Sequence, residues 1–269
     1  MSSLPRLPAA VLGALFMLLA PGGCSAVADD DASGTLLGEE SETQVSGLGA
    51  KHALRRYVVV PNRSDSTLAV LSTTGEILGK VTRDTVGFEF EPTYATHRAQ
   101  SDLVAVADRK NSRIMVFDSD TMRYRGYIPA SDGLFHLWPS ADGRTLFVVA
   151  DVDDVVDVVT VRRTGRGIRY ARRTFDAGAA VPGGKPHDVV ADDRHFYVTV
   201  QVAGAAKDEI LKVDQRSLAV EGRLAMSLDT HLGMPTDTPF LLVPEQTDGE
   251  LNYVVRDTFE VAQTVKGLP

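Results

Sequence analysis

Three histidines recur at a similar point of a repeating unit and are the side chains best suited to chemistry. His136, His187 and His231 lie 51 and 44 residues apart, and an apolar run begins 9 or 10 residues after each of them. A neutral imidazole is both a metal ligand and a proton acceptor. With Asp188, these histidines form a predicted ligand set for zinc or copper. The alternative is that the three histidines are structural and only bond the backbone of a neighbouring blade. The sequence favours this alternative, because their spacing is that of a structural repeat.

Short strands must position these histidines. Three alternating apolar segments fill one slot of the repeat, and each is followed by a Ser or Thr and then an apolar residue: 114–118 with Thr121 and Met122, 210–214 with Ser217 and Leu218, and 251–255 with Thr258 and Phe259. A period in the forties made of short strands and turns is typical of a β-propeller. The sequence therefore predicts an all-β propeller of four-stranded blades, with the histidines at one mouth of its channel.

The stretch 186–199 (PHDVVADDRHFYVT) carries a family resemblance, because Tyr197-Val198-Thr199 matches three of the four name-giving letters of the YVTN-type β-propeller repeat. The segments that begin at Tyr57 and Ala141 are similar to the same repeat, and the resemblance covers roughly residues 50 to 269. It implies a ring of about seven blades. It is specific for fold rather than function, because one fold hosts many functions.

Five blades are predicted, at about 50–88, 89–131, 132–180, 181–227 and 228–269. Either they close as a five-bladed ring or they belong to a truncated or incompletely closed copy of a larger one. Residues 43–56 make a poor first inner strand. We therefore favour the second alternative.

The N-terminal region has the features of an export signal. Arg6 precedes an apolar stretch that is too short for a permanent membrane span and ends just before Cys24, the single cysteine of the chain. This pattern resembles a bacterial lipobox, and cleavage after Ala28 is the competing interpretation. We expect a signal peptide at 1–23, a lipidated tether at 24–48 and a propeller at 49–269. The protein would then be exported and anchored to a membrane, in the periplasm or at the cell surface.

The expected tether is acidic. It carries six acids and no Lys or Arg: Asp29, Asp30, Asp31, Glu39, Glu40 and Glu42. Like charges without counter-charges favour a solvated segment. The formal net charge of the whole chain is −8, which does not favour a nucleic-acid partner.

An arginine-rich stretch runs against this acidic balance. Its members are Arg162, Arg163, Arg166, Arg169, Arg172 and Arg173. They are candidates for binding an anion. The alternative, which we prefer, is a charged outer strand edge that discourages aggregation and is partly paired with Asp151, Asp153, Asp154 and Asp157.

Other catalytic patterns are missing from the sequence. It contains no HExxH, no GxSxG and no paired-cysteine zinc motif. The sequence therefore predicts a membrane-anchored, non-enzymatic module that binds an unidentified protein or small molecule. A zinc- or copper-binding propeller is the first alternative. A lactonase-like hydrolase ranks last, because the inner strands offer His, Thr and Met rather than Glu and Asn.

Overall fold

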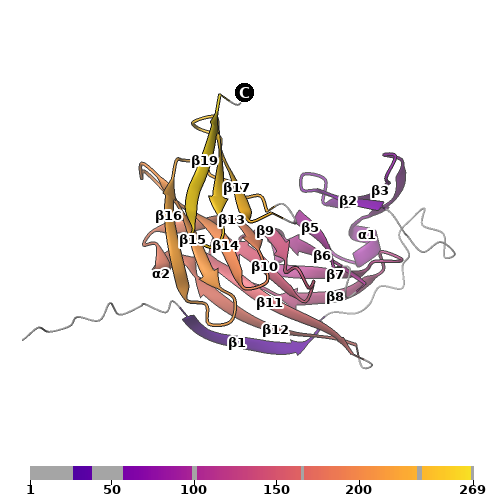
Figure 1. Ribbon diagram of the computed structural model, residues 1–269. Helices are drawn as coiled ribbons and strands as arrows, with labels where there is room; N and C mark the ends of the chain where they lie inside the picture. Colours follow the sequence, from indigo (N-terminus) through magenta and orange to yellow (C-terminus); the bar gives the residue numbers. More distant parts are fainter. Residues whose placement is uncertain (1–26, 38–56, 99–101, 165–166, 235–237, 268–269) are drawn as a thin grey trace, which may run out of the picture.

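The computed structural model describes residues 27–37, 57–98, 102–164, 167–234 and 238–267. Within them, the chain forms five antiparallel sheets joined by turns (Figure 1). Helical turns are short and occur at α1 (Arg83–Val86), η1 (Arg109–Asn111) and α2 (Ala177–Ala180). The predicted all-β propeller is confirmed.

Each sheet is built from strands that follow one another in the chain, apart from β1. The first sheet contains β2 (Tyr57–Asn62), β3 (Thr67–Ser72) and β4 (Ile77–Val81). The second contains β5 (Pro92–Arg98), β6 (Leu103–Asp108), β7 (Arg113–Asp118) and β8 (Tyr124–Pro129). The third contains β9 (Leu134–Pro139), β10 (Thr145–Ala150), β11 (Val155–Thr164), β12 (Gly167–Asp176) and, at its outer edge, β1 (Val27–Thr35). The fourth contains β13 (Gly184–Ala191), β14 (His195–Val202), β15 (Asp208–Asp214) and β16 (Val220–Met226), and the fifth β17 (Phe240–Glu245), β18 (Glu250–Val255) and β19 (Glu260–Lys266).

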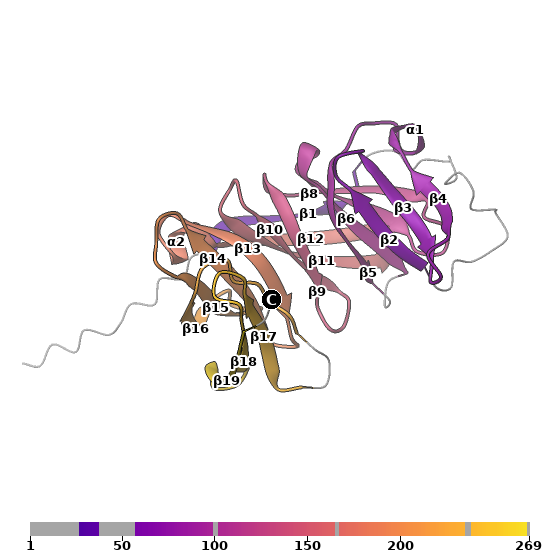
Figure 2. The same ribbon diagram turned by 90° about the horizontal axis from the view of Figure 1, so that it is seen from above.

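The inner strands of the middle blades lie side by side, with β9 in contact with both β5 and β13. In the fifth blade, Thr230 and Gly233 form isolated bridges to β17, on the side where an inner strand would lie. The blades follow an arc that starts at β2–β4 and ends at β17–β19 (Figure 2). Over the described residues, the arc is open, which agrees with the incompletely closed alternative. The two end sheets have three strands each, whereas four were predicted.

The hydrophobic core is divided among the interfaces between neighbouring blades. Four clusters of buried apolar side chains lie there, one between each blade and the next. Between the third and fourth blades, for example, Phe147 of β10 stacks on Phe196 of β14 with 5.1 Å between ring centroids. A fully buried side chain of this size stabilises the fold by about 1.5–3 kcal/mol. The blades are therefore held in a fixed angular relation by the same alternation that defines the strands.

The turn predicted from the repeat occurs in three blades. Met122, Leu218 and Phe259 have positive φ angles of 53°, 58° and 56°. Each donates its N–H to the carbonyl four residues earlier, at 2.8 to 2.9 Å. Their side chains are buried, at 0%, 1% and 8% exposed. Burial of the apolar side chain offsets the cost of the left-handed backbone.

The structure corrects part of the expected tether. Residues 27–35 form β1, which pairs antiparallel with β12, and Leu37 forms a bridge to Tyr127 of β8. The backbone groups along the free edge of β12 are satisfied by this pairing, which local charge density cannot reveal. Cys24, the signal peptide at 1–23 and tether residues 25–26 and 38–48 lie outside the described residues. Within the part of the chain that the structure describes, we find no helix with the length and apolar character of a membrane span.

Candidate functional site

Four aromatic or imidazole rings from consecutive blades form a row at one end of the inner strands. Tyr94 of β5 lies 4.0 Å from His136 of β9, His136 lies 5.8 Å from His187 of β13, and His187 lies 5.0 Å from His231, all measured between ring centroids. The predicted convergence of the three histidines is therefore present. Tyr94 holds the equivalent place in the second blade.

A β-bulge in each of the three middle inner strands directs these side chains. Residues 93 and 94 of β5 together face one residue of β6, because the register moves from Pro92 opposite Asp108 to Ala95 opposite Val106. The registers of β9 and β13 shift in the same way around residues 135–136 and 187–188. A bulge re-aims its side chains and is frequent beside functional sites.

The bulges also show that His136 and His187 are not equivalent. His136 takes the second bulge position, which in β13 belongs to Asp188. His187 takes the first, which in β9 belongs to Phe135. The two histidines therefore approach the row from different places in the blade, and His136 meets Asp188 directly.

The Asp188 side chain links three blades through its contacts with His136 and Leu232. Its side chain is 6% exposed, and Oδ1 lies 2.5 Å from Nδ1 of His136. Oδ1 also accepts the N–H of Val189 at 2.8 Å, and Oδ2 accepts that of Leu232 at 2.9 Å. Burial by itself would raise the pKa of Asp188, but the bonds from His136 and the two backbone groups hold the pKa below its usual value. Asp188 is therefore an ionised carboxylate.

His187 is held in its neutral form. Burial lowers its pKa, and the neighbouring imidazoles of His231 and His136 lower it further. Burial also raises the pKa of the Tyr94 phenol, as does the charge of Asp188. The row thus combines an ionised carboxylate with a neutral imidazole.

A second group overlaps the row. His187, Asp229 and His231 each offer a ligand atom, and these atoms lie within 4.8 Å of one another. Two imidazoles and a carboxylate suit zinc and copper. The predicted metal set was His136, His187, His231 and Asp188, so the structure differs by placing Asp229 in the group and engaging Asp188 with His136. Sequence reasoning missed Asp229, although it lies two residues before His231 in the chain.

A cleft of about 330 Å³ opens beside Asp229. Its lining residues are Lys185, Gln201, Val202, Ala203, Asp208, Leu228 and Asp229. Lys185 donates to Oδ1 of Asp154 at 3.0 Å and to the carbonyl of Asp151 at 2.9 Å. Burial raises the pKa of Asp208, and the charge of Asp229 adds to that effect. A mixed polar and apolar lining of this volume suits a small ligand.

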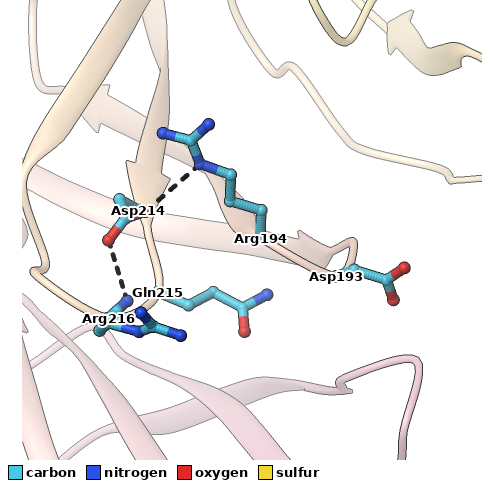
Figure 3. Close-up of a pocket in the computed structure, with 5 residues that line it drawn as sticks. All are labelled: Asp193, Arg194, Asp214, Gln215 and Arg216. Atoms are coloured by element: carbon cyan, nitrogen blue, oxygen red, sulfur yellow. Dashed lines mark hydrogen bonds and ion pairs between the residues drawn. The ribbon is translucent and has the colours of Figure 1, made fainter.

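A larger hollow of about 620 Å³ lies at the turns after β13 and β15. It is lined by Asp193, Arg194, Asp214, Gln215 and Arg216 (Figure 3). Arg194 pairs with Asp214 at 3.6 Å and with Glu221 at 3.1 Å. A second potential ligand group, His195, Asp214 and Glu221, is found here, and the same guanidinium already compensates its two carboxylates. The inner-strand site therefore has the better-placed chemistry.

The arginine stretch is divided among separate partners. Arg172 lies 3.5 Å from the buried Asp157, as the paired-edge interpretation expected, and Arg163 lies 3.8 Å from Asp118. Arg173 donates to the carbonyls of Gln215 and Arg216 at 2.7 Å. Arg162 and Arg169 face each other across β11 and β12 and are exposed, and Arg166 lies outside the described residues. Anion binding by the full set stays a prediction.

The sequence matches no known family profile and no curated protein. Solved structures match it by fold. The periplasmic gluconolactonase of Pseudomonas aeruginosa gives a TM-score of 0.57 at 18% identity, covering 79% of this chain and 67% of that one. A Bacteroides uniformis protein, whose assignment as a 6-phosphogluconolactonase is provisional, gives 0.62 at 12% identity, covering 79% and 69%. The dihydro-heme d1 dehydrogenase NirN in complex with DHE gives a TM-score of 0.52 at 15% identity. The match covers 89% of this chain but only 49% of NirN, so this chain spans about half the length of that protein.

The predicted non-enzymatic binding module is corrected by these findings. Propellers that bear gluconolactonase names are among the matched structures. The site also contains a buried contact between Asp188 and His136, a pair of residue types that can act as a carboxylate and a base. The lactonase-like alternative ranked last in the sequence analysis because the inner strands offer His, Thr and Met rather than the Glu and Asn residues expected of such an enzyme. The site instead offers Asp188 and His136.

Proposed function

We propose that this protein is a lactonase-like hydrolase that opens a small cyclic ester with water. The observation that carries the proposal is the 2.5 Å contact between Nδ1 of His136 and the ionised Asp188, in a row of rings that leads to the cleft at Asp229. The gluconolactonase names among structures of the same fold support it.

His136 is the proposed general base. When the ring is neutral and Nδ1 donates a hydrogen bond to Asp188, Nε2 carries the lone pair. That nitrogen takes a proton from water, the hydroxyl adds to the ester carbonyl, and the tetrahedral intermediate expels the ring oxygen. The imidazolium returns the proton to the departing oxygen, so lactone and water become a hydroxy acid. Asp188 stabilises the imidazolium between the two steps.

The proposed substrate is small. A cleft of about 330 Å³ is at the lower end of the usual range of about 300–1,000 Å³ for ligand pockets. Its apolar side chains, Val202, Ala203 and Leu228, would contact a ring, and Lys185 and Gln201 would contact hydroxyl or acidic substituents. A single sugar-sized lactone fits this description.

The YVTN-type resemblance and the N-terminal pattern extend the proposal to the location of the enzyme. It would be exported to the periplasm or the cell surface and anchored through a lipid on Cys24. A periplasmic gluconolactonase among the structures of the same fold is consistent with this location. In a bacterial host, Cys24→Ala should move the protein from the membrane fraction to the soluble exported fraction.

The test measures acid release from glucono-δ-lactone and γ-butyrolactone with a pH indicator, corrected for spontaneous hydrolysis. His136→Gln should lower kcat by about 10²- to 10⁴-fold, the usual contribution of a general base. His97→Gln, at an exposed histidine on the inner strand β5, is the matched control and should retain activity. Wild-type protein that hydrolyses neither lactone, or an unaffected His136→Gln variant, would contradict the proposal.

A further inference from the structure

The side chains of His187, Asp229 and His231 meet beside the cleft. None of the three takes part in the contact between His136 and Asp188. We propose that these three residues bind one divalent transition-metal ion of the zinc type. The proposal goes beyond hydrolysis and does not depend on it, because the ion would bind without substrate.

The geometry needs only a small adjustment. The three ligand atoms lie within 4.8 Å of one another. Tetrahedral ligands at about 2.0–2.1 Å from zinc are about 3.4 Å apart. The Asp229 side chain is 49% exposed and His231 is 26% exposed, so both have room to rotate inward. His187 is half-buried and supplies the fixed ligand.

The two nitrogens of His231 face different carboxylates. Nε2 lies 3.7 Å from Oδ1 of Asp229, on the side of the proposed ion, and Nδ1 lies 3.7 Å from Oδ2 of Asp188. A metal-bound imidazole commonly directs its other nitrogen to a carboxylate, which orients the ring. Asp188 is held by Leu232 and His136, so it is already positioned for that role.

The surrounding charge also suits a cation. Asp188 and Asp229 each lie 3.7 Å from a nitrogen of His231, and Asp208 lines the same cleft as Asp229. The ammonium of Lys185 in that cleft is paired with Asp154. Three protein ligands leave a fourth position for water or for a ligand oxygen, as in catalytic zinc sites. Because Asp229 also lines the cleft, that position is beside the space proposed for the substrate.

The experiment is a zinc titration of the full chain, produced without an affinity tag and stripped with a chelator, using a chromophoric competitor. We expect one zinc ion per chain. Asp229→Asn, at an exposed position that the fold tolerates, should weaken zinc binding by at least about tenfold, and the double variant His187→Gln/His231→Gln should abolish it. His97→Gln is the matched control and should bind as the wild type does.

The second group of potential ligands provides the decisive comparison. His195→Gln should leave zinc binding unchanged, because His195, Asp214 and Glu221 lie at the other pocket. Wild-type protein that binds no zinc would overturn the proposal. So would wild-type binding by Asp229→Asn and the double variant, or loss of binding in His195→Gln. Loss of lactone hydrolysis in His136→Gln with zinc still bound would separate this proposal from the hydrolase proposal.

Discussion

Asp188 of one blade lies 2.5 Å from Nδ1 of His136 in the preceding blade, and the two residues hold corresponding bulge positions in β13 and β9. A carboxylate and an imidazole thus come from the same place in two copies of one repeat. The repeat positions both, and their different side chains give each a different role.

The role proposed for Asp188 is to orient His136 and stabilise its protonated form. Asp188→Asn should therefore lower kcat for lactone hydrolysis by about 10²- to 10⁴-fold with little change in KM, because an amide favours the wrong imidazole tautomer. Steady-state kinetics on glucono-δ-lactone and γ-butyrolactone measure kcat and KM separately. Asp193→Asn, an exposed acid on the turn after the same strand, is the control. A rise in KM with unchanged kcat would contradict the orienting role.

The cleft beside Asp229 should set substrate access. Ala203→Trp would fill much of its roughly 330 Å³ with an indole ring, so kcat/KM should fall by at least about tenfold while zinc binding is retained. Ala206→Trp, exposed on the same turn and outside the lining, should leave kcat/KM near the wild-type value. Equal effects of the two substitutions would mean that the substrate binds elsewhere.

The contact of residues 36–37 with β8 should be measurable through Gly126. This glycine has a φ of +119°, and an added Cβ would lie 2.7 Å from the carbonyl oxygen of Leu37. Gly126→Ala should cost about 1–3 kcal/mol from backbone strain alone, and more while Leu37 is in place. Urea unfolding of Gly126→Ala, of a chain lacking residues 27–37, and of the combination forms a double-mutant cycle. A coupling energy near zero would show that the segment does not pack there.

Unfolding in acid should reveal how much the Asp192 carboxylate stabilises the turn in which it lies. This carboxylate accepts the N–H groups of Arg194 and His195 at 2.9 and 2.7 Å and the hydroxyl of Tyr197 at 2.8 Å. Burial would raise its pKa, but these bonds lower the pKa below the usual value. A folded pKa below the unfolded pKa gives stability that is present at neutral pH and is lost as the pH falls through the folded pKa.

Asp192→Ala should therefore lower the unfolding free energy at pH 7, and the difference from wild type should shrink in strong acid. Urea titrations between pH 7 and pH 2 measure it. Asp193→Ala removes a neighbouring exposed acid from the same turn and is the control. A difference that stays constant down to pH 2 would assign the loss to packing rather than to charge.

The blade repeat was predictable because it follows from patterns among residues that are close together in the sequence. The alternation of residues 210–214 and the turn at Ser217 and Leu218 depend on neighbours within a few residues, and the structure places Leu218 as the repeat predicted. β1 was not predictable in this way. Its pairing with β12 joins residues far apart in the chain, and the acidic composition of the segment favoured solvation.

For the site, the meeting of His136, His187 and His231 could be predicted from the sequence alone, because the three recur at similar points of successive blades and such points lie at one mouth of the channel. Which atoms meet depends on how the strands pair. The bulge in β13 is set by its pairing with β14, where Thr199 Oγ1 accepts the N–H of Asp188 at 2.9 Å. That pairing directs Asp188 to His136 and leaves His187 for Asp229. A one-residue shift against a partner strand changes the direction of a side chain, and no pattern within a single strand encodes it.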